Sequence, residues 1–218
     1  MSETAVATPH GDGRLVLAEA GSAVATLLLS HGAGNGIESA DLAALARDLP
    51  GRGVSVALFE QPWRVAGRRI ATPPATLDVG LRAAAEALAA VHPLMVGGRS
   101  AGARSAARCA TALGAVGCLA LSFPLHPPGR PEKSRLAELA GCGVPTLVVQ
   151  GERDSMGRPE EFPDELPGVE LLVVPYADHG LKVPARAPLT IAEAHARIID
   201  AVADWISRCV VGPAFGNH

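Results

Sequence analysis

Short apolar runs alternate with alanine-rich helical patterns from one end of the chain to the other, and this order limits the folds available to it. The alternation is typical of a mostly parallel sheet covered by helices on both faces. Several runs are almost continuously apolar, as strands buried on both faces must be. The predicted central strands are 24–30, 54–59, 93–97, 116–122, 144–150 and 169–174, and 14–20 can add an antiparallel strand at the start.

Helical apolar spacing separates these strands. Helices are predicted over 39–49, 76–91, 101–113, 133–140 and 190–208. Thr190 and Glu193 form a capping-box pattern at the start of the last helix, which we expect to close the fold against the sheet. The sequence contains no internal repeat and no long linker. We therefore predict a single α/β domain over 1–218, with its core at about 14–208.

The composition is that of a globular protein. Hydrophobic residues make up 48% of the chain and charged residues 19%, and the formal net charge of −3 argues against a general nucleic-acid binder. No stretch approaches the roughly 20 apolar residues that a membrane span needs, and the four cysteines lack CxxC spacing. We therefore expect a cytoplasmic monomer or homodimer with no nucleic-acid or membrane partner.

A GxSxG pattern, Gly98-Arg99-Ser100-Ala101-Gly102, lies directly after a predicted strand and directly before a predicted helix. In a nucleophile elbow the serine occupies a sharp strand-to-helix turn, and small residues two positions before and after it avoid collisions with neighbouring elements. Glycine occupies both of those positions here. The pattern therefore predicts that Ser100 is a catalytic nucleophile at a helix N-terminus.

Asp154 and His179 can complete a catalytic triad with Ser100. A serine hydroxyl needs a base to take its proton and a carboxylate to orient that base, and in this kind of fold the order along the chain is Ser, then Asp or Glu, then His. Both residues follow predicted strands, at the sheet edge where Ser100 is expected. Glu152 and Asp178 are the alternative acids, although Asp178 adjoins His179 and neighbouring residues on an extended loop point apart.

An acyl-transfer site also needs donors for the oxyanion, usually two backbone N–H groups. Ala101, the residue after the nucleophile, is the first expected donor. The second is expected from the glycine-rich run HGAGNG at 31–36, which follows the first central strand. Ala33 is the preferred donor in that run and Gly32 the second choice.

The same run permits a different interpretation. Gly32 and Gly34 after a strand, followed by a helix and a second strand ending near Glu60, resemble a dinucleotide-binding fingerprint. Ile37 occupies the position of the third glycine, and this interpretation leaves Ser100 and its expected partners without a role.

Four runs of the chain resemble a known group of proteins. The sequence is similar to the lid-less α/β-hydrolases grouped with testis-expressed protein thirty and the third subunit of the NSL chromatin complex, which are related to dienelactone hydrolases. The runs are LSHGAG at 29–34, GGRSAG at 97–102, LSFPLH at 121–126 and ADH at 177–179. The resemblance implies an α/β-hydrolase fold and the triad positions above. Its alternative is an interaction protein with that fold and no turnover.

We therefore predict a serine hydrolase that cleaves an ester-type bond of a small acyl substrate, as a carboxylesterase or a dienelactone-hydrolase-like enzyme, with no cofactor and no metal. The loop after the strand 116–122 is too short for a helical cap, so we expect no cap domain and an open site. Five loop residues at the active edge are candidates for substrate contact: Trp63, Phe123, Leu125, His126 and Met156.

Overall fold

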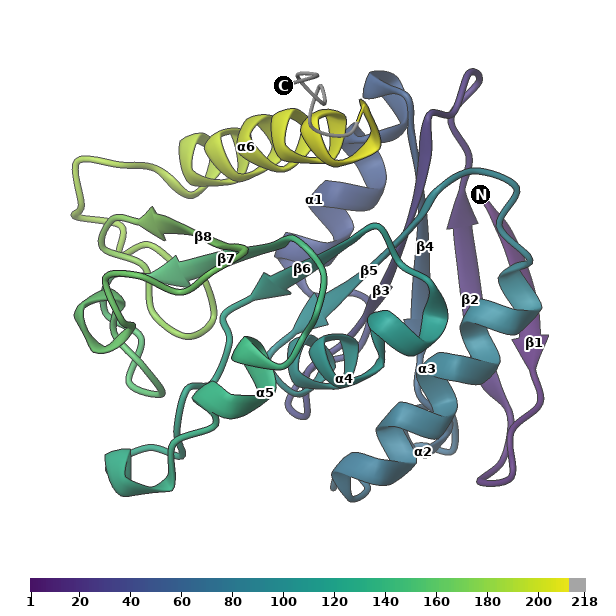
Figure 1. The fold of residues 1–218 in the computed structure, drawn as a ribbon, viewed down its shortest axis with the longest axis horizontal. Helices are drawn as coiled ribbons and strands as arrows, with labels where there is room; N and C mark the ends of the chain where they lie inside the picture. The colour runs from purple at the N-terminus through teal and green to yellow at the C-terminus, as the bar shows by residue number, and fades with distance from the viewer. Residues whose placement is uncertain (212–218) are drawn as a thin grey trace, which may run out of the picture.

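The structure, a computed structural model, describes residues 1–211, and its centre is one eight-stranded sheet with strand order β1-β2-β4-β3-β5-β6-β7-β8 (Figure 1). The end of the predicted domain, 212–218, lies outside the described residues. The strands are β1 (Ser2–Val6), β2 (Gly13–Ala18), β3 (Ala25–Ser30), β4 (Val54–Glu60), β5 (Leu94–Arg99), β6 (Gly117–Leu121), β7 (Thr146–Gly151) and β8 (Val169–Val174).

The connections between strands contain the helices. They are α1 (Ala40–Asp48), α2 (Pro62–Val65), α3 (Pro74–Leu88), α4 (Ala101–Cys109), α5 (Leu136–Ala140) and α6 (Ile191–Val211). Short 3-10 turns lie at Pro50–Arg52, Thr111–Leu113, Pro131–Lys133 and Pro159–Glu161. The predicted helix 101–113 is therefore divided into α4 and a 3-10 turn. Within 1–211, no helix has the length and apolar character needed to cross a bilayer.

The strands from β3 to β8 pair in parallel, as predicted, so their carboxyl ends meet at one edge of the sheet. The antiparallel strand predicted over 14–20 is confirmed as β2, which pairs with β4. Strand β1 was not predicted and pairs with β2 in a hairpin at the sheet edge. Only Val6 in β1 is buried, so this strand has no apolar pattern that its sequence could reveal.

Successive side chains of a strand point to opposite faces, and different helices cover the two faces (Figure 1). On one face Leu27 packs in a buried cluster with Leu42 of α1 and Ile198 of α6. On the other face Leu28 packs in a cluster with residues of α3, α4 and α5, such as Ala106. The fully buried strands in the middle of the sheet explain the continuous apolar runs of the sequence.

Helix α6 closes one face of the sheet and begins with the predicted capping box. The Thr190 N–H donates to Glu193 Oε2 over 2.8 Å, and the Glu193 N–H donates to Thr190 Oγ1 over 3.2 Å. The two bonds satisfy backbone donors at the start of the helix that have no acceptor within it. This prediction is confirmed.

Candidate active site

Ser100 occupies a strained turn between β5 and α4. Its φ of 52° and ψ of −109° lie outside the regions that residues with side chains ordinarily adopt. The two flanking glycines allow this close turn: a Cβ on Gly98 would lie 2.5 Å from the Ser30 carbonyl oxygen, and a Cβ on Gly102 would lie 2.8 Å from the His31 carbonyl oxygen. The turn therefore has the geometry that the GxSxG pattern predicts, with Ser100 partly exposed above it.

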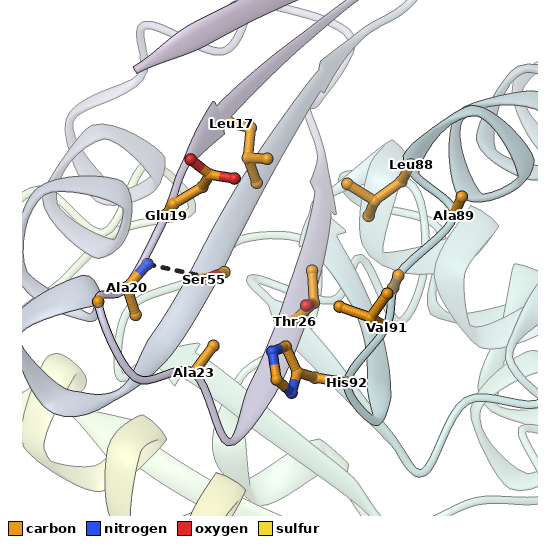
Figure 2. Close-up of a pocket in the computed structure, with 12 residues that line it drawn as sticks. Leu17, Glu19, Ala20, Ala23, Thr26, Ser55, Leu88, Ala89, Val91 and His92 are labelled. Atoms are coloured by element: carbon orange, nitrogen blue, oxygen red, sulfur yellow. Dashed lines mark hydrogen bonds between the residues drawn. The ribbon is translucent and has the colours of Figure 1, made fainter.

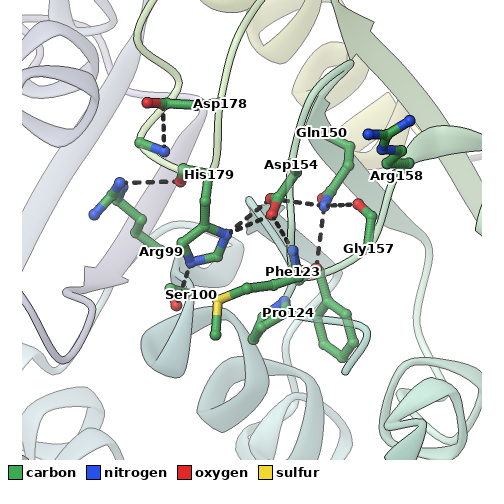
Figure 3. A network of polar contacts seen from close by, with 12 residues as sticks. Arg99, Ser100, Phe123, Pro124, Gln150, Asp154, Gly157, Arg158, Asp178 and His179 are labelled. Atoms are coloured by element: carbon green, nitrogen blue, oxygen red, sulfur yellow. Dashed lines mark hydrogen bonds and ion pairs between the residues drawn. The ribbon is translucent and has the colours of Figure 1, made fainter. Parts of the chain in front are cut away.

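The structure brings Ser100, His179 and Asp154 into one hydrogen-bonded chain (Figure 3). His179 Nε2 lies 2.9 Å from Ser100 Oγ, and His179 Nδ1 lies 2.8 Å from Asp154 Oδ2. Because the carboxylate only accepts, Nδ1 carries the proton and Nε2 accepts from the serine hydroxyl. The imidazole is therefore held in the tautomer that can take the proton of Ser100.

Asp154 is fully buried, and two donors besides His179 hold its carboxylate. The Met156 N–H donates to Oδ1 over 2.8 Å, and Gln150 Nε2 donates to Oδ2 over 2.9 Å. Gln150 Nε2 also contacts the Gly157 carbonyl oxygen at 2.7 Å. This role of Gln150 was not predicted, although a glutamine that ends an apolar strand is a usable signal.

Neither alternative acid touches the imidazole. Asp178 Oδ1 accepts from the N–H of Gly180 at 2.7 Å and of Lys182 at 3.0 Å, which organises the loop behind His179 (Figure 3). Glu152 Oε2 accepts from the Tyr176 N–H. Both carboxylates are occupied with loop backbone, which leaves Asp154 as the partner of His179.

The glycine-rich run lies beside the nucleophile. A Cβ built on Gly32 would lie 3.3 Å from Ser100 Cβ. The next residue, Ala33, is exposed, and Ala101 begins α4, so its N–H has no acceptor within the helix. The glycine-rich run and the start of α4 therefore both lie next to Ser100, and the oxyanion donors within them stay a prediction.

His31 fixes the start of this run. Its Nε2 accepts from the Gln61 N–H at 3.0 Å, so Nδ1 carries the proton and donates to the Gly32 carbonyl oxygen at 2.8 Å. The imidazole ring also packs on Trp63, with ring centroids 5.5 Å apart. Burial lowers the pKa of His31, because the charged form loses solvation, while the Gly32 carbonyl opposes this shift.

Four of the five residues expected to contact substrate are buried. Trp63 is 3% exposed, Phe123 0%, Leu125 4% and His126 6%. Phe123 and Leu125 belong to the core cluster beneath α4. Trp63 lies in α2 and not in a loop as predicted, and all four side chains present almost no surface to a ligand. Of the five, only Met156, close to Asp154, is partly exposed, and its contact with a substrate stays a prediction.

His126 ties two loops together. Its Nε2 contacts Glu161 Oε2 at 2.8 Å, and its Nδ1 contacts the Pro127 carbonyl oxygen at 2.8 Å. Both partners accept, so the arrangement favours the doubly protonated ring, and the Pro127 carbonyl and the Glu161 carboxylate raise the pKa of His126. Both ring nitrogens of His126 are therefore engaged in contacts between loops.

The dinucleotide interpretation finds no structural support. In that fingerprint the glycines open a helix whose N-terminus binds the pyrophosphate. Here α1 begins only at Ala40, several residues after Gly34. Glu60, the acidic residue at the end of the second strand, is buried and pairs with Arg14 at 2.7 Å.

A cavity lies at the opposite end of the sheet from Ser100. It has a volume of about 460 Å³ and is lined by Glu19, Thr26, Ser55 and His92 among others (Figure 2). Thr26 and Ser55 lie at the amino ends of β3 and β4, whereas Ser100 follows the carboxyl end of β5. Ligands of open α/β sheets bind at carboxyl ends, so this cavity is separate from the candidate active site.

The α/β-hydrolase fold is defined by a mostly parallel sheet with a strained serine in a strand-to-helix turn. The acid and the histidine lie in later loops of that fold, as they do here. A family model described as an alpha/beta hydrolase domain matches residues 23–207. The chain therefore belongs to the alpha/beta hydrolase domain family. A search of curated proteins found no match.

Solved structures share this fold at low sequence identity. An α/β serine hydrolase without a lid from Xanthomonas campestris has a TM-score of 0.69 at 20% identity, with 94% of each chain covered. Est1E from Butyrivibrio proteoclasticus has a TM-score of 0.73 at 12% identity, covering 95% of this chain and 100% of that one. Dienelactone hydrolase from Anabaena variabilis has a TM-score of 0.72 at 17% identity, covering 94% and 96%. At these identities the likeness establishes the fold.

Proposed function

We propose that this protein is a serine hydrolase that cleaves ester bonds of small acyl substrates through an acyl-enzyme. The observation that carries the proposal is the pair of contacts made by the His179 ring, 2.9 Å to Ser100 Oγ and 2.8 Å to Asp154 Oδ2. A buried acid, a correctly protonated imidazole and a strained serine have no shared structural purpose, whereas nucleophilic catalysis requires all three.

In the proposed reaction Ser100 Oγ attacks the substrate carbonyl carbon while His179 Nε2 takes the hydroxyl proton. The tetrahedral oxyanion accepts hydrogen bonds from the N–H groups of Ala33 and Ala101. Gly32 is the alternative donor to Ala33. His179 then gives its proton to the leaving alcohol, and the ester of Ser100 remains. Water, deprotonated by His179, attacks this ester, and the acid leaves as the proton returns to Ser100.

The proposal of an ester substrate that enters from solvent is supported by the lack of a cap over the site. Within the described residues, the connection from β6 to α5 contains only the 3-10 turn Pro131–Lys133. The names of the structural neighbours, which include a dienelactone hydrolase, also favour an ester or lactone. The proposal needs neither a metal nor a cofactor.

We also propose that the chain belongs with the lid-less α/β-hydrolases grouped with testis-expressed protein thirty. The runs at 29–34, 97–102, 121–126 and 177–179 support this grouping. A cytoplasmic location is proposed as well. The free cysteines Cys109, Cys118, Cys142 and Cys209 favour a reducing compartment.

Hydrolysis of p-nitrophenyl esters of increasing acyl length tests the proposal. We expect the wild type to cleave short-chain esters fastest, and Ser100→Ala to lose at least about 1,000-fold in kcat, because the nucleophile of the acyl-enzyme is gone. Equal activity of the two proteins would overturn the assignment of Ser100. A wild type inert toward every ester and toward a fluorophosphonate would favour the non-catalytic interaction protein.

A further inference from the structure

We propose that Arg99 is a positioning residue that, together with Asp41, holds the backbone of His179 in place beside Ser100; this inference rests on the proposed function. Arg99 ends β5 immediately before the nucleophile. Its Nη2–H donates to the His179 carbonyl oxygen over 3.1 Å (Figure 3), and its Nε lies 3.0 Å from Asp41 Oδ2 in the first turn of α1. One guanidinium thus links the turn at Ser100, α1 and the loop that carries His179.

The loop that carries His179, between β8 and α6, is tied to the loop after β7 by the Arg153 N–H, which donates to the Ala177 carbonyl oxygen. The Arg99 bond adds a link on the side of Ser100. Tyr176 and Leu181 have positive φ values of 62° and 52°, so the chain on both sides of His179 turns sharply. Asp178 organises the loop internally, but its bonds reach only the loop's own backbone. The Arg99 bond joins the backbone of His179 to the strand that carries Ser100, while Asp154 holds the imidazole from the other side.

The burial of this ion pair argues for a positional role. The Arg99 and Asp41 side chains are 9% and 3% exposed. A buried ion pair is often no more stabilising than apolar residues of the same size, because both charges lose their hydration. Arg99 and Asp41 meet at 3.0 Å as an ion pair without a well-directed hydrogen bond. The directed contact of Arg99 is the bond from Nη2–H to the His179 carbonyl oxygen, which an apolar side chain could not make. Asp41 therefore supplies the negative charge that lets the Arg99 guanidinium stay buried, and the bond to His179 gives the pair its positional role.

The same geometry argues against direct substrate binding by Arg99. Its Nε is turned toward Asp41 and its Nη2 toward His179, and little of the side chain reaches solvent. A residue that positions the base lowers kcat when it is altered, whereas a residue that binds substrate equally in ground and transition states raises KM. The two roles can therefore be separated by steady-state kinetics.

The test compares Arg99→Lys and Asp41→Asn with a matched control, Arg108→Lys. Arg108 on α4 also forms an ion pair, at 2.7 Å with Asp78, and touches none of the three proposed catalytic residues. We expect Arg99→Lys to lower kcat about 100-fold, as a misplacement near 1 Å does, with KM within about twofold of wild type. Asp41→Asn should show the same pattern, and it serves as the readout if Arg99→Lys does not fold. A kcat loss no greater than that of Arg108→Lys, or a raised KM at unchanged kcat, would overturn the inference.

Proton NMR separates this inference from the proposed function. The hydrogen-bonded Nδ1–H of His179 should give a downfield resonance, identified by its absence in His179→Asn. We expect it to shift or broaden in Arg99→Lys and to stay in place in Arg108→Lys, whether or not the protein hydrolyses esters. If the wild type is inert but this resonance responds, the function fails and the positioning role stands. A resonance unchanged in Arg99→Lys overturns the positioning role even in an active enzyme.

Discussion

The side-chain amide of Gln150 donates to Asp154 Oδ2 over 2.9 Å, in a place where neither residue is exposed to solvent. Gln150 lies at the end of β7 and Asp154 in the loop that follows, so the strand itself orients the acid. The base of the proposed triad is therefore held by a chain of contacts that starts in the core of the sheet.

Replacing Gln150 by leucine should impair both stability and turnover. The change removes one donor from a buried carboxylate, and a hydrogen bond to a charged group contributes about 1.5–3 kcal/mol, which corresponds to roughly tenfold or more in kcat if it is lost in the transition state. Gln61→Leu is the matched control, since Gln61 is also a buried glutamine and, within residues 1–211, its side chain bonds only to Ser30 and Leu77. An equal kcat loss in both variants would contradict this role for Gln150.

Asp154→Asn should fold but lose most of its activity. In one orientation the new NH2 group would face the donors Met156 N–H or Gln150 Nε2–H. In the other it would donate to His179 Nδ1 and favour the wrong tautomer of the imidazole. We expect kcat to fall by roughly 10,000-fold, as in the equivalent change of a protease triad. Circular dichroism checks the fold, and a kcat within tenfold of wild type, about 1.4 kcal/mol, would count against Asp154.

Alanine at Gly98 should destabilise the protein more than alanine at an open glycine. A Cβ at Gly98 would lie 2.5 Å from the Ser30 carbonyl oxygen and 2.7 Å from the Gly102 carbonyl carbon, both backbone atoms. Overpacking of this kind costs about 1–3 kcal/mol. Gly34→Ala is the control, since no atom of the described part of the chain lies within 4 Å of its added Cβ. Urea unfolding measures the difference, and equal midpoints would show that the turn has more room than the structure indicates.

Two histidines should give stability opposite dependences on pH. Burial lowers the pKa of His31 below the ordinary value of 6.5, so the folded state binds fewer protons than the unfolded state just below that pH. The contribution of His31 is present above pH 6.5 and is lost as the pH falls toward its lowered pKa. The pKa of His126 is raised by the Pro127 carbonyl and by Glu161, so its contribution is present below pH 6.5 and is lost as the pH rises through the raised pKa.

Urea unfolding of His31→Asn and His126→Gln between about pH 5 and pH 9 separates these effects. Relative to wild type, His31→Asn should lose less stability on acidification, and His126→Gln should lose less on passing to alkaline pH. Variants with the wild-type slope at both ends of the range would show that neither histidine is linked to folding in this way.

Much of the fold could be predicted because its central strands are buried on both faces and carry continuous apolar runs. The elbow could be predicted as well, since the strain at Ser100 requires small residues at fixed positions. Strand β1 could not be predicted in this way, because it lies at the edge of the sheet and four of its five residues are exposed.

The supporting residues of the site could not be predicted from local patterns. The contact between Arg99 and Asp41 joins a strand end to a different helix, and only the folded topology brings them together. Burial was equally hard to foresee: Phe123 follows a strand at the active edge, but it turns into the core and is 0% exposed. Position along the chain indicates the edge of the sheet, whereas packing decides which side chains face the ligand.

The most direct test is to react the protein with a fluorophosphonate probe and to locate the adduct by mass spectrometry of its peptides. We predict a single covalent adduct on Ser100, none in Ser100→Ala, and labelling of His179→Ala slowed by at least about 1,000-fold, since the serine then has no base. Labelling of another residue, or rapid labelling of Ser100 without His179, would contradict the proposed triad.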